Sequence, residues 1–131
     1  MKTILIVEDD ANLRELIKLR LEEHNYNVID VPDGMQMFKK MRKAKPDLII
    51  LDVMLPKMDG NKLCGLLKNY DPYQDIPVII FTALSGPKSK KIAKDMGAEA
   101  YITKPFDAKI LINKINELLR DHDAQSAKNN P

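Results

Sequence analysis

Patterns typical of β-strands and α-helices alternate five times along this chain of 131 residues. Apolar runs of strand length occupy residues 3–7, 27–31, 47–52, 78–82 and 100–103. Helical patterns follow them at about residues 11–24, 34–43, 60–69, 87–96 and 107–120. This alternation predicts an α/β fold, a parallel sheet with helices on both faces and right-handed crossovers.

The second strand run, at residues 27–31, is short and is the most polar of the five. We therefore expect it at an edge of the sheet. This favours a flavodoxin-like, doubly wound sheet of five parallel strands in the order 2-1-3-4-5, with five helices. Residues 1–121 are expected to form one domain. Residues 122–131 have no apolar side chain apart from two alanines, so we expect a flexible tail there.

Chemically useful side chains follow four of the five strand runs. Glu8 and Asp9 follow the first, Asp52 ends the third, Thr82 ends the fourth and Lys104 follows the fifth. The carboxyl ends of parallel strands meet at one edge of the sheet, which is where open α/β sheets place their sites. A solvated acidic turn that caps the next helix is the alternative reading of residues 8–10, and Asp10 fits that capping role.

The composition excludes several classes of protein. The net charge of +2 gives no argument for binding nucleic acid or a membrane surface. No apolar run approaches the roughly 20 residues that a membrane span needs, and residues 1–3 pass directly into a strand, so no signal peptide is expected. A single cysteine, Cys64, permits no internal disulfide and fits a reducing cytoplasm; we expect a small, buried side chain there.

Four segments in this order resemble the motifs of response-regulator receiver domains. They are Ile4-Leu5-Ile6-Val7-Glu8-Asp9-Asp10, Leu51-Asp52-Val53-Met54-Leu55-Pro56-Lys57-Met58-Asp59-Gly60, Phe81-Thr82-Ala83 and Gly97-Ala98-Glu99-Ala100-Tyr101-Ile102-Thr103-Lys104-Pro105-Phe106. Each segment alone is weakly specific, but together they are highly specific. The resemblance covers about residues 2–120.

The resemblance implies a role for each of these positions. Asp52 would be the phosphoacceptor, Lys104 would contact the phosphoryl group, and a cis bond is expected before Pro105. Mg²⁺, with Mn²⁺ as a possible substitute, would be bound by Glu8, Asp9, Asp52 and the backbone carbonyl of Met54. Oxygen ligands suit these metals, and a cation would offset the charge of the carboxylates.

The resemblance also implies a switch. Thr82 would move to bind the phosphoryl group and Tyr101 would turn inward, which would reshape the surface of the helix at 87–96, the strand at 100–103 and the last helix. The lysines on that surface form either a docking patch or an ordinary solvated face. The charged residues there are Glu99 and six lysines: Lys88, Lys90, Lys91, Lys94, Lys109 and Lys114.

As partners we expect a sensor histidine kinase or a histidine phosphotransfer protein, and downstream either another protein or an output domain. The chain would catalyse only its own phosphorylation and dephosphorylation. We expect a monomer before phosphorylation, and dimerisation through the switch surface stays open. Met54 and Leu84 lie two residues beyond Asp52 and Thr82, and the resemblance implies that side chains at these positions flank the path of the hydrolytic water. Because both are apolar and cannot orient a water molecule, we expect slow self-dephosphorylation.

The residues argue against three other functions. A phosphatase of the haloacid dehalogenase type needs a second Asp two residues after the first, where this chain has Met54. A pseudo-receiver that signals without phosphate would not need the complete set of acidic, Thr and Lys positions. A flavin-binding module needs a hydroxyl- and glycine-rich loop after the first strand, where Glu8 and Asp9 would repel a phosphate.

Overall fold

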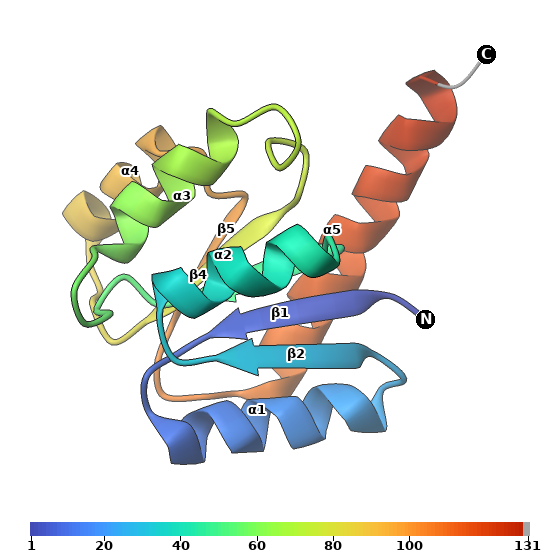
Figure 1. The fold of residues 1–131 in the computed structure, drawn as a ribbon. Helices are drawn as coiled ribbons and strands as arrows, with labels where there is room; N and C mark the ends of the chain where they lie inside the picture. The colour runs from blue at the N-terminus through green and yellow to red at the C-terminus, as the bar shows by residue number, and fades with distance from the viewer. Residues whose placement is uncertain (130–131) are drawn as a thin grey trace.

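The computed structural model describes residues 1–129, which form five strands and five helices in alternation (Figure 1). The strands are β1 (Thr3–Val7), β2 (Asn27–Val31), β3 (Leu48–Leu51), β4 (Val78–Thr82) and β5 (Ala100–Thr103). The helices are α1 (Ala11–Glu23), α2 (Gly34–Lys43), α3 (Gly60–Lys68), α4 (Pro87–Asp95) and α5 (Ala108–Asn129).

The sheet is parallel throughout and has the order β2-β1-β3-β4-β5. This confirms the predicted flavodoxin-like strand order and the edge position of β2. β1 pairs with both β2 and β3, so the chain reverses its direction of travel across the sheet between β1 and β3. Ligands of open α/β sheets bind at such a reversal.

Side chains of the central strands alternate between two cores. Ile4 and Ile6 pack on the side covered by α1 and α5, with Ile17 and Leu111. The intervening strand residues, such as Leu5, pack on the side covered by α2, α3 and α4. Figure 1 shows α1 and α2 on opposite sides of the sheet. Because both faces are covered, the central strands β1, β3 and β4 are apolar almost throughout rather than alternating.

The end of α5 differs from the prediction. The apolar pattern predicted that this helix ends near Arg120, but α5 continues to Asn129. The flexibility expected from residue 122 onward stays a prediction. The last turns of α5 project beyond the sheet (Figure 1). Apolar periodicity reports packing and not helicity, and residues 121–129 contain neither Gly nor Pro to end the helix. Residues 130–131 of the predicted tail lie outside the described residues.

Within residues 1–129, no helix is both long enough and apolar enough to cross a bilayer.

Candidate functional site

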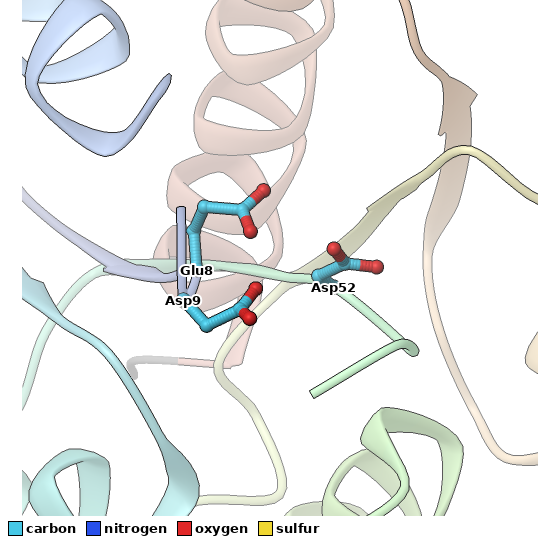
Figure 2. Close-up of side chains that lie close together, drawn as sticks. All are labelled: Glu8, Asp9 and Asp52. Atoms are coloured by element: carbon cyan, nitrogen blue, oxygen red, sulfur yellow. The ribbon is translucent and has the colours of Figure 1, made fainter. Parts of the chain in front are cut away.

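Five predicted site residues come from the ends of four strands. Glu8 and Asp9 follow β1, Asp52 follows β3, Thr82 ends β4 and Lys104 follows β5. Figure 2 shows Glu8, Asp9 and Asp52 gathered at this edge of the sheet. Their ligand oxygens lie within 4.8 Å of one another. Glu8 and Asp52 are buried, whereas Asp9 is exposed.

The Asp52 carboxylate is held at both oxygens. Oδ1 accepts a hydrogen bond of 3.0 Å from the backbone N–H of Met54, and Oδ2 accepts one of 2.8 Å from the ammonium of Lys104. The backbone N–H of Asp52 also donates to the carbonyl of Val7 on β1. Asp52 is only 4% exposed, so this carboxylate is fixed in place and largely shielded from water.

Lys104 neutralises part of the acidic cluster. Its Nζ lies 2.6 Å from Glu8 Oε1 and 2.8 Å from Asp52 Oδ2, and 5.6 Å from the centre of the Phe81 ring. Burial alone would lower the pKa of Lys104, but the hydrogen bonds to Asp52 and Glu8 outweigh burial, and the pKa is raised. Lys104 is therefore a fixed cation at neutral pH. The peptide bond between Lys104 and Pro105 is cis, as the resemblance implied.

Glu8 is the more deeply buried of the two acids that follow β1. Burial raises the pKa of its carboxyl, while the hydrogen bonds from Lys104 and from the backbone N–H of Asp10 oppose this rise. A second cation beside Glu8 would favour its ionised form. When Glu8, Asp9 and Asp52 are all ionised, the site has more negative charge than the single ammonium of Lys104 can balance.

Arg14 supports the acidic turn, and the sequence interpretation missed this residue. Its Nη1 donates to the backbone carbonyl of Glu8 at 2.8 Å, and its Nε donates to Asp30 Oδ2 on β2 at 2.9 Å. Glu8 is further held by a bond from its N–H to the carbonyl of Val31. An arginine in the first turn of the helix after the acidic residues was the available signal. Its partner, Asp30, is set by the pairing of β1 with β2.

Asp10 caps α1, as the sequence indicated. Its side chain accepts hydrogen bonds from the backbone N–H groups of Asn12 and Leu13. This capping role separates Asp10 from its acidic neighbours, whose carboxylates face Asp52 instead.

Gly60 permits the close approach of α3 to the segment that contains Asp52. A Cβ at this position would lie 2.1 Å from the backbone carbonyl oxygen of Asp52. The N–H of Gly60 donates to the carbonyl of Val53 at 3.0 Å, and Asp59 caps the helix through the N–H of Asn61. Any side chain at residue 60 would push α3 away from the end of β3.

The two predicted switch residues lie on neighbouring strands. Thr82 is fully buried, and its Oγ1 lies 3.4 Å from the backbone N of Leu84, which donates to it. The hydroxyl of Tyr101 donates to the carbonyl of Leu84 at 2.7 Å. Burial raises the pKa of Tyr101, so the hydroxyl stays protonated as this bond requires. Thr82 and Tyr101 therefore contact the same residue, Leu84, through its two backbone groups.

Met54 and Leu84 both expose apolar side chains at this edge of the sheet, at 55% and 43%. The backbone N–H of Met54 contacts Asp52, and the role of its carbonyl as a metal ligand stays a prediction.

The comparisons with known proteins identify the family. The family profile described as the response regulator receiver domain matches residues 4–116. The chain belongs to the response-regulator receiver family. The carboxylates of Glu8, Asp9 and Asp52 and the ammonium of Lys104 therefore lie in a receiver domain, and their roles in it stay predictions.

Curated relatives are regulators. The chain is 39% identical over 98% of its length to the DNA-binding dual master transcriptional regulator RpaA of Synechocystis, of which it covers 54%. It is 42% identical over 92% of its length to the response regulator ArlR of Staphylococcus aureus, of which it covers 53%. The chain thus spans about half the length of these relatives.

Solved structures agree with the fold. A CheY-like receiver domain protein from Methanospirillum hungatei superposes with a TM-score of 0.88 at 27% identity, covering 95% of this chain and 98% of that one. The receiver domain of a signal transduction histidine kinase from Syntrophus aciditrophicus superposes with a TM-score of 0.85 at 38% identity, covering 92% of both chains. Receivers attached to different kinds of protein therefore share this fold.

Proposed function

We propose that this receiver accepts a phosphoryl group on Asp52 from a histidine kinase or a histidine phosphotransfer protein in a reaction that depends on Mg²⁺. The observation that carries the proposal is the buried Asp52 carboxylate, bound by Lys104 at 2.8 Å and clustered with Glu8 and Asp9. A carboxylate oxygen attacks phosphorus, and the bond to the donor breaks with its electron pair leaving on the donor. The chain catalyses only its own modification.

The charge at the site explains the need for a metal. Three carboxylates and one ammonium leave about two negative charges before an anionic phosphoryl donor approaches. Glu8, Asp9 and Asp52 offer only oxygen atoms, which suit Mg²⁺ or Mn²⁺. When bound, such an ion neutralises charge and holds a phosphoryl oxygen. Glu8 and Asp9 would bind it together with one oxygen of Asp52, and the Met54 carbonyl is the further ligand we propose.

Lys104 is the second source of positive charge. Its ammonium is already within hydrogen-bond distance of Asp52, so it can contact a phosphoryl group bonded to that carboxylate without a large movement. Its other contact, with Glu8, ties the position of the ammonium to the metal-binding acids.

The proposed output is a change in the surface formed by α4, β5 and α5. A phosphoryl group on Asp52 would attract the Thr82 hydroxyl, whose present contact with the N–H of Leu84 is long at 3.4 Å. Tyr101 is bonded to the carbonyl of the same residue, so a movement of the β4–α4 loop would release or redirect its ring. The altered surface would control a partner protein or an output domain.

The first test is incubation of the full chain with acetyl phosphate and Mg²⁺, followed by intact mass. We expect the gain of one phosphoryl group, and no gain with Asp52→Asn or when the metal is chelated. If the folded protein gains nothing, a phosphorylated phosphotransfer protein should replace acetyl phosphate as donor. Failure with both donors would contradict the proposal and favour a pseudo-receiver.

A further inference from the structure

A groove runs between α2 and α3, on helices other than those of the proposed output surface. Its larger part is a cavity of about 580 Å³ lined by Phe38, Arg42, Leu66, Asn69, Tyr70 and Tyr73. A smaller cavity of about 150 Å³ shares Phe38 and continues to Met35 and Met58. The groove therefore extends from the loop that follows β3 to the loop that follows α3.

The groove has an apolar floor that is open to solvent. Leu66 and Tyr70 are 53% and 54% exposed, and Met35 and Met58 are also exposed. The rings of Tyr70 and Tyr73 lie edge to face with their centres 5.1 Å apart, which gives one end of the groove a defined wall. Single exposed apolar residues are ordinary, but a continuous line of them marks a binding surface.

The helix on one side of the groove is basic, and Arg42 of this helix lines the larger cavity. α2 carries four cationic side chains and no acidic one: Lys39, Lys40, Arg42 and Lys43. None of the four has an ion-pair partner within the part of the chain that the structure describes. Lys57 adds a cation at the other end, and Asp33 there is occupied as the cap of α2.

We propose that the groove between α2 and α3 binds an acidic amphipathic helix of a partner protein. The apolar side of such a helix, with residues at i, i+3, i+4 and i+7, would cover the line from Met58 to Tyr70. Its acidic residues would face α2, where Arg42 can bind a carboxylate with two hydrogen bonds. The nine residues of α3 span about 14 Å, which matches between two and three turns of a bound helix.

A second copy of this chain fits the groove less well. A twofold dimer through this face would bring two basic α2 helices together, and their like charges would repel. A small molecule would fill only one of the two cavities and leave the rest of the apolar line exposed. An acidic helix fits the length of the groove and the positive charge of Arg42 and Lys57 at its two ends.

The test uses the full, unphosphorylated chain labelled with ¹⁵N and a synthetic helical peptide of about 14 residues, capped at both ends. The peptide carries Leu and Phe on one side and Glu beside them, and a matched peptide carries Lys in place of every Glu. We expect the Glu peptide to shift the amide signals of Phe38, Leu66 and Tyr70, and the Lys peptide to bind at least about tenfold more weakly. The test does not involve Asp52, so its outcome is independent of phosphorylation.

Two exposed positions supply variants with matched controls. Arg42→Glu and Leu66→Ser should each weaken binding of the Glu peptide about tenfold. Lys88→Glu on α4 and Leu19→Ser on α1 make the same chemical changes elsewhere and should leave binding unchanged. Far-ultraviolet circular dichroism checks that each variant is folded.

Four results would overturn the proposal. Two concern the peptides: shifts confined to the amide signals of α4 and β5, and equal binding of the Glu and Lys peptides. The third is a concentration-dependent shift of the groove signals without peptide, which would show self-association. The fourth is binding of a small aromatic acid such as 2-naphthoate in the groove without binding of the peptide.

Discussion

Two lysine–carboxylate contacts of nearly equal length lie at opposite ends of the strands of the sheet. Lys104 is 2.8 Å from Asp52 at the carboxyl ends of the strands, and Lys2 is 2.9 Å from Asp123 at the amino ends. The side chains of the first pair are 20% and 5% exposed, and those of the second pair are 41% and 55% exposed. Distance therefore does not distinguish these contacts, whereas burial does.

The difference in burial sets their energies and roles. The exposed pair is screened by water and salt, and such pairs contribute little to stability. At the buried site, loss of the cation would leave two carboxylates close together with little water to solvate them. The same two residue types thus form an exposed ion pair at the amino ends of the strands and part of a buried charged cluster at the carboxyl ends.

Removal of the buried cation should have the largest effect. Lys104→Met should slow phosphorylation by acetyl phosphate about 100-fold, because it removes a charged donor to the transferring group. Without Mg²⁺ it should also lower the free energy of unfolding by about 3 kcal/mol, since Glu8 and Asp52 lose their shared partner. Intact mass over time and urea unfolding measure the two effects.

Lys109→Met is the matched control, because Lys109 is exposed on α5. If Lys104→Met and Lys109→Met are phosphorylated equally fast, Lys104 has no part in the chemistry.

The apolar surroundings of the buried site should slow hydrolysis of the phosphorylated state. Met54→Asn combined with Leu84→Glu should speed the loss of the phosphoryl group several-fold, because polar side chains can orient a water molecule where these apolar ones cannot. The decay is followed by intact mass after removal of the donor. An unchanged decay rate would contradict the idea that these two positions control the lifetime.

The support of the acidic turn should have a smaller effect. Arg14→Lys keeps the charge but loses the planar group that contacts both the Glu8 carbonyl and Asp30, so Mg²⁺ should bind about threefold more weakly. NMR titration with Mg²⁺ measures the affinity. Arg20→Lys on the exposed side of α1 is the control, and a loss of stability without a loss of metal affinity would show that Arg14 only supports the fold.

The exposed pair should show the smallest effect. Lys2→Met should lower the free energy of unfolding by less than about 0.5 kcal/mol, because water screens this contact. The hydrogen bond to Asp123 raises the pKa of Lys2 above 10.5, so the folded state holds this proton more tightly. The contribution of this contact to the free energy of unfolding is therefore complete below about pH 10.5, and it is lost as pH rises through the raised pKa of Lys2.

Urea unfolding of the wild-type chain and Lys2→Met at pH 7 and at pH 11.5 tests this sign. A difference that grows with pH would contradict it, and a large difference at neutral pH would remove the contrast between the two contacts.

Much of the fold was predictable because strand and helix patterns are local. Five apolar runs predicted five strands, and the polar character of residues 27–31 predicted the edge strand. The end of α5 was not predictable from apolar spacing, since residues 121–125 are mostly exposed and residues 121–129 carry no apolar pattern. Leu66 shows another limit of apolar spacing, because it lies at helical spacing from the buried Leu63 and yet is exposed beside the groove.

The sequence by itself determined the α/β class and the residue types at the strand ends, because these depend on periodicity and on the direction of parallel strands. It favoured the strand order through the polar second strand, and the structure has that order. Only the tertiary structure decided which side chains share a partner. The contact of Lys104 with both Glu8 and Asp52 joins positions up to 96 residues apart. The groove between α2 and α3 likewise depends on how two helices pack. Such contacts arise when the strands and helices assemble, and no local pattern encodes them.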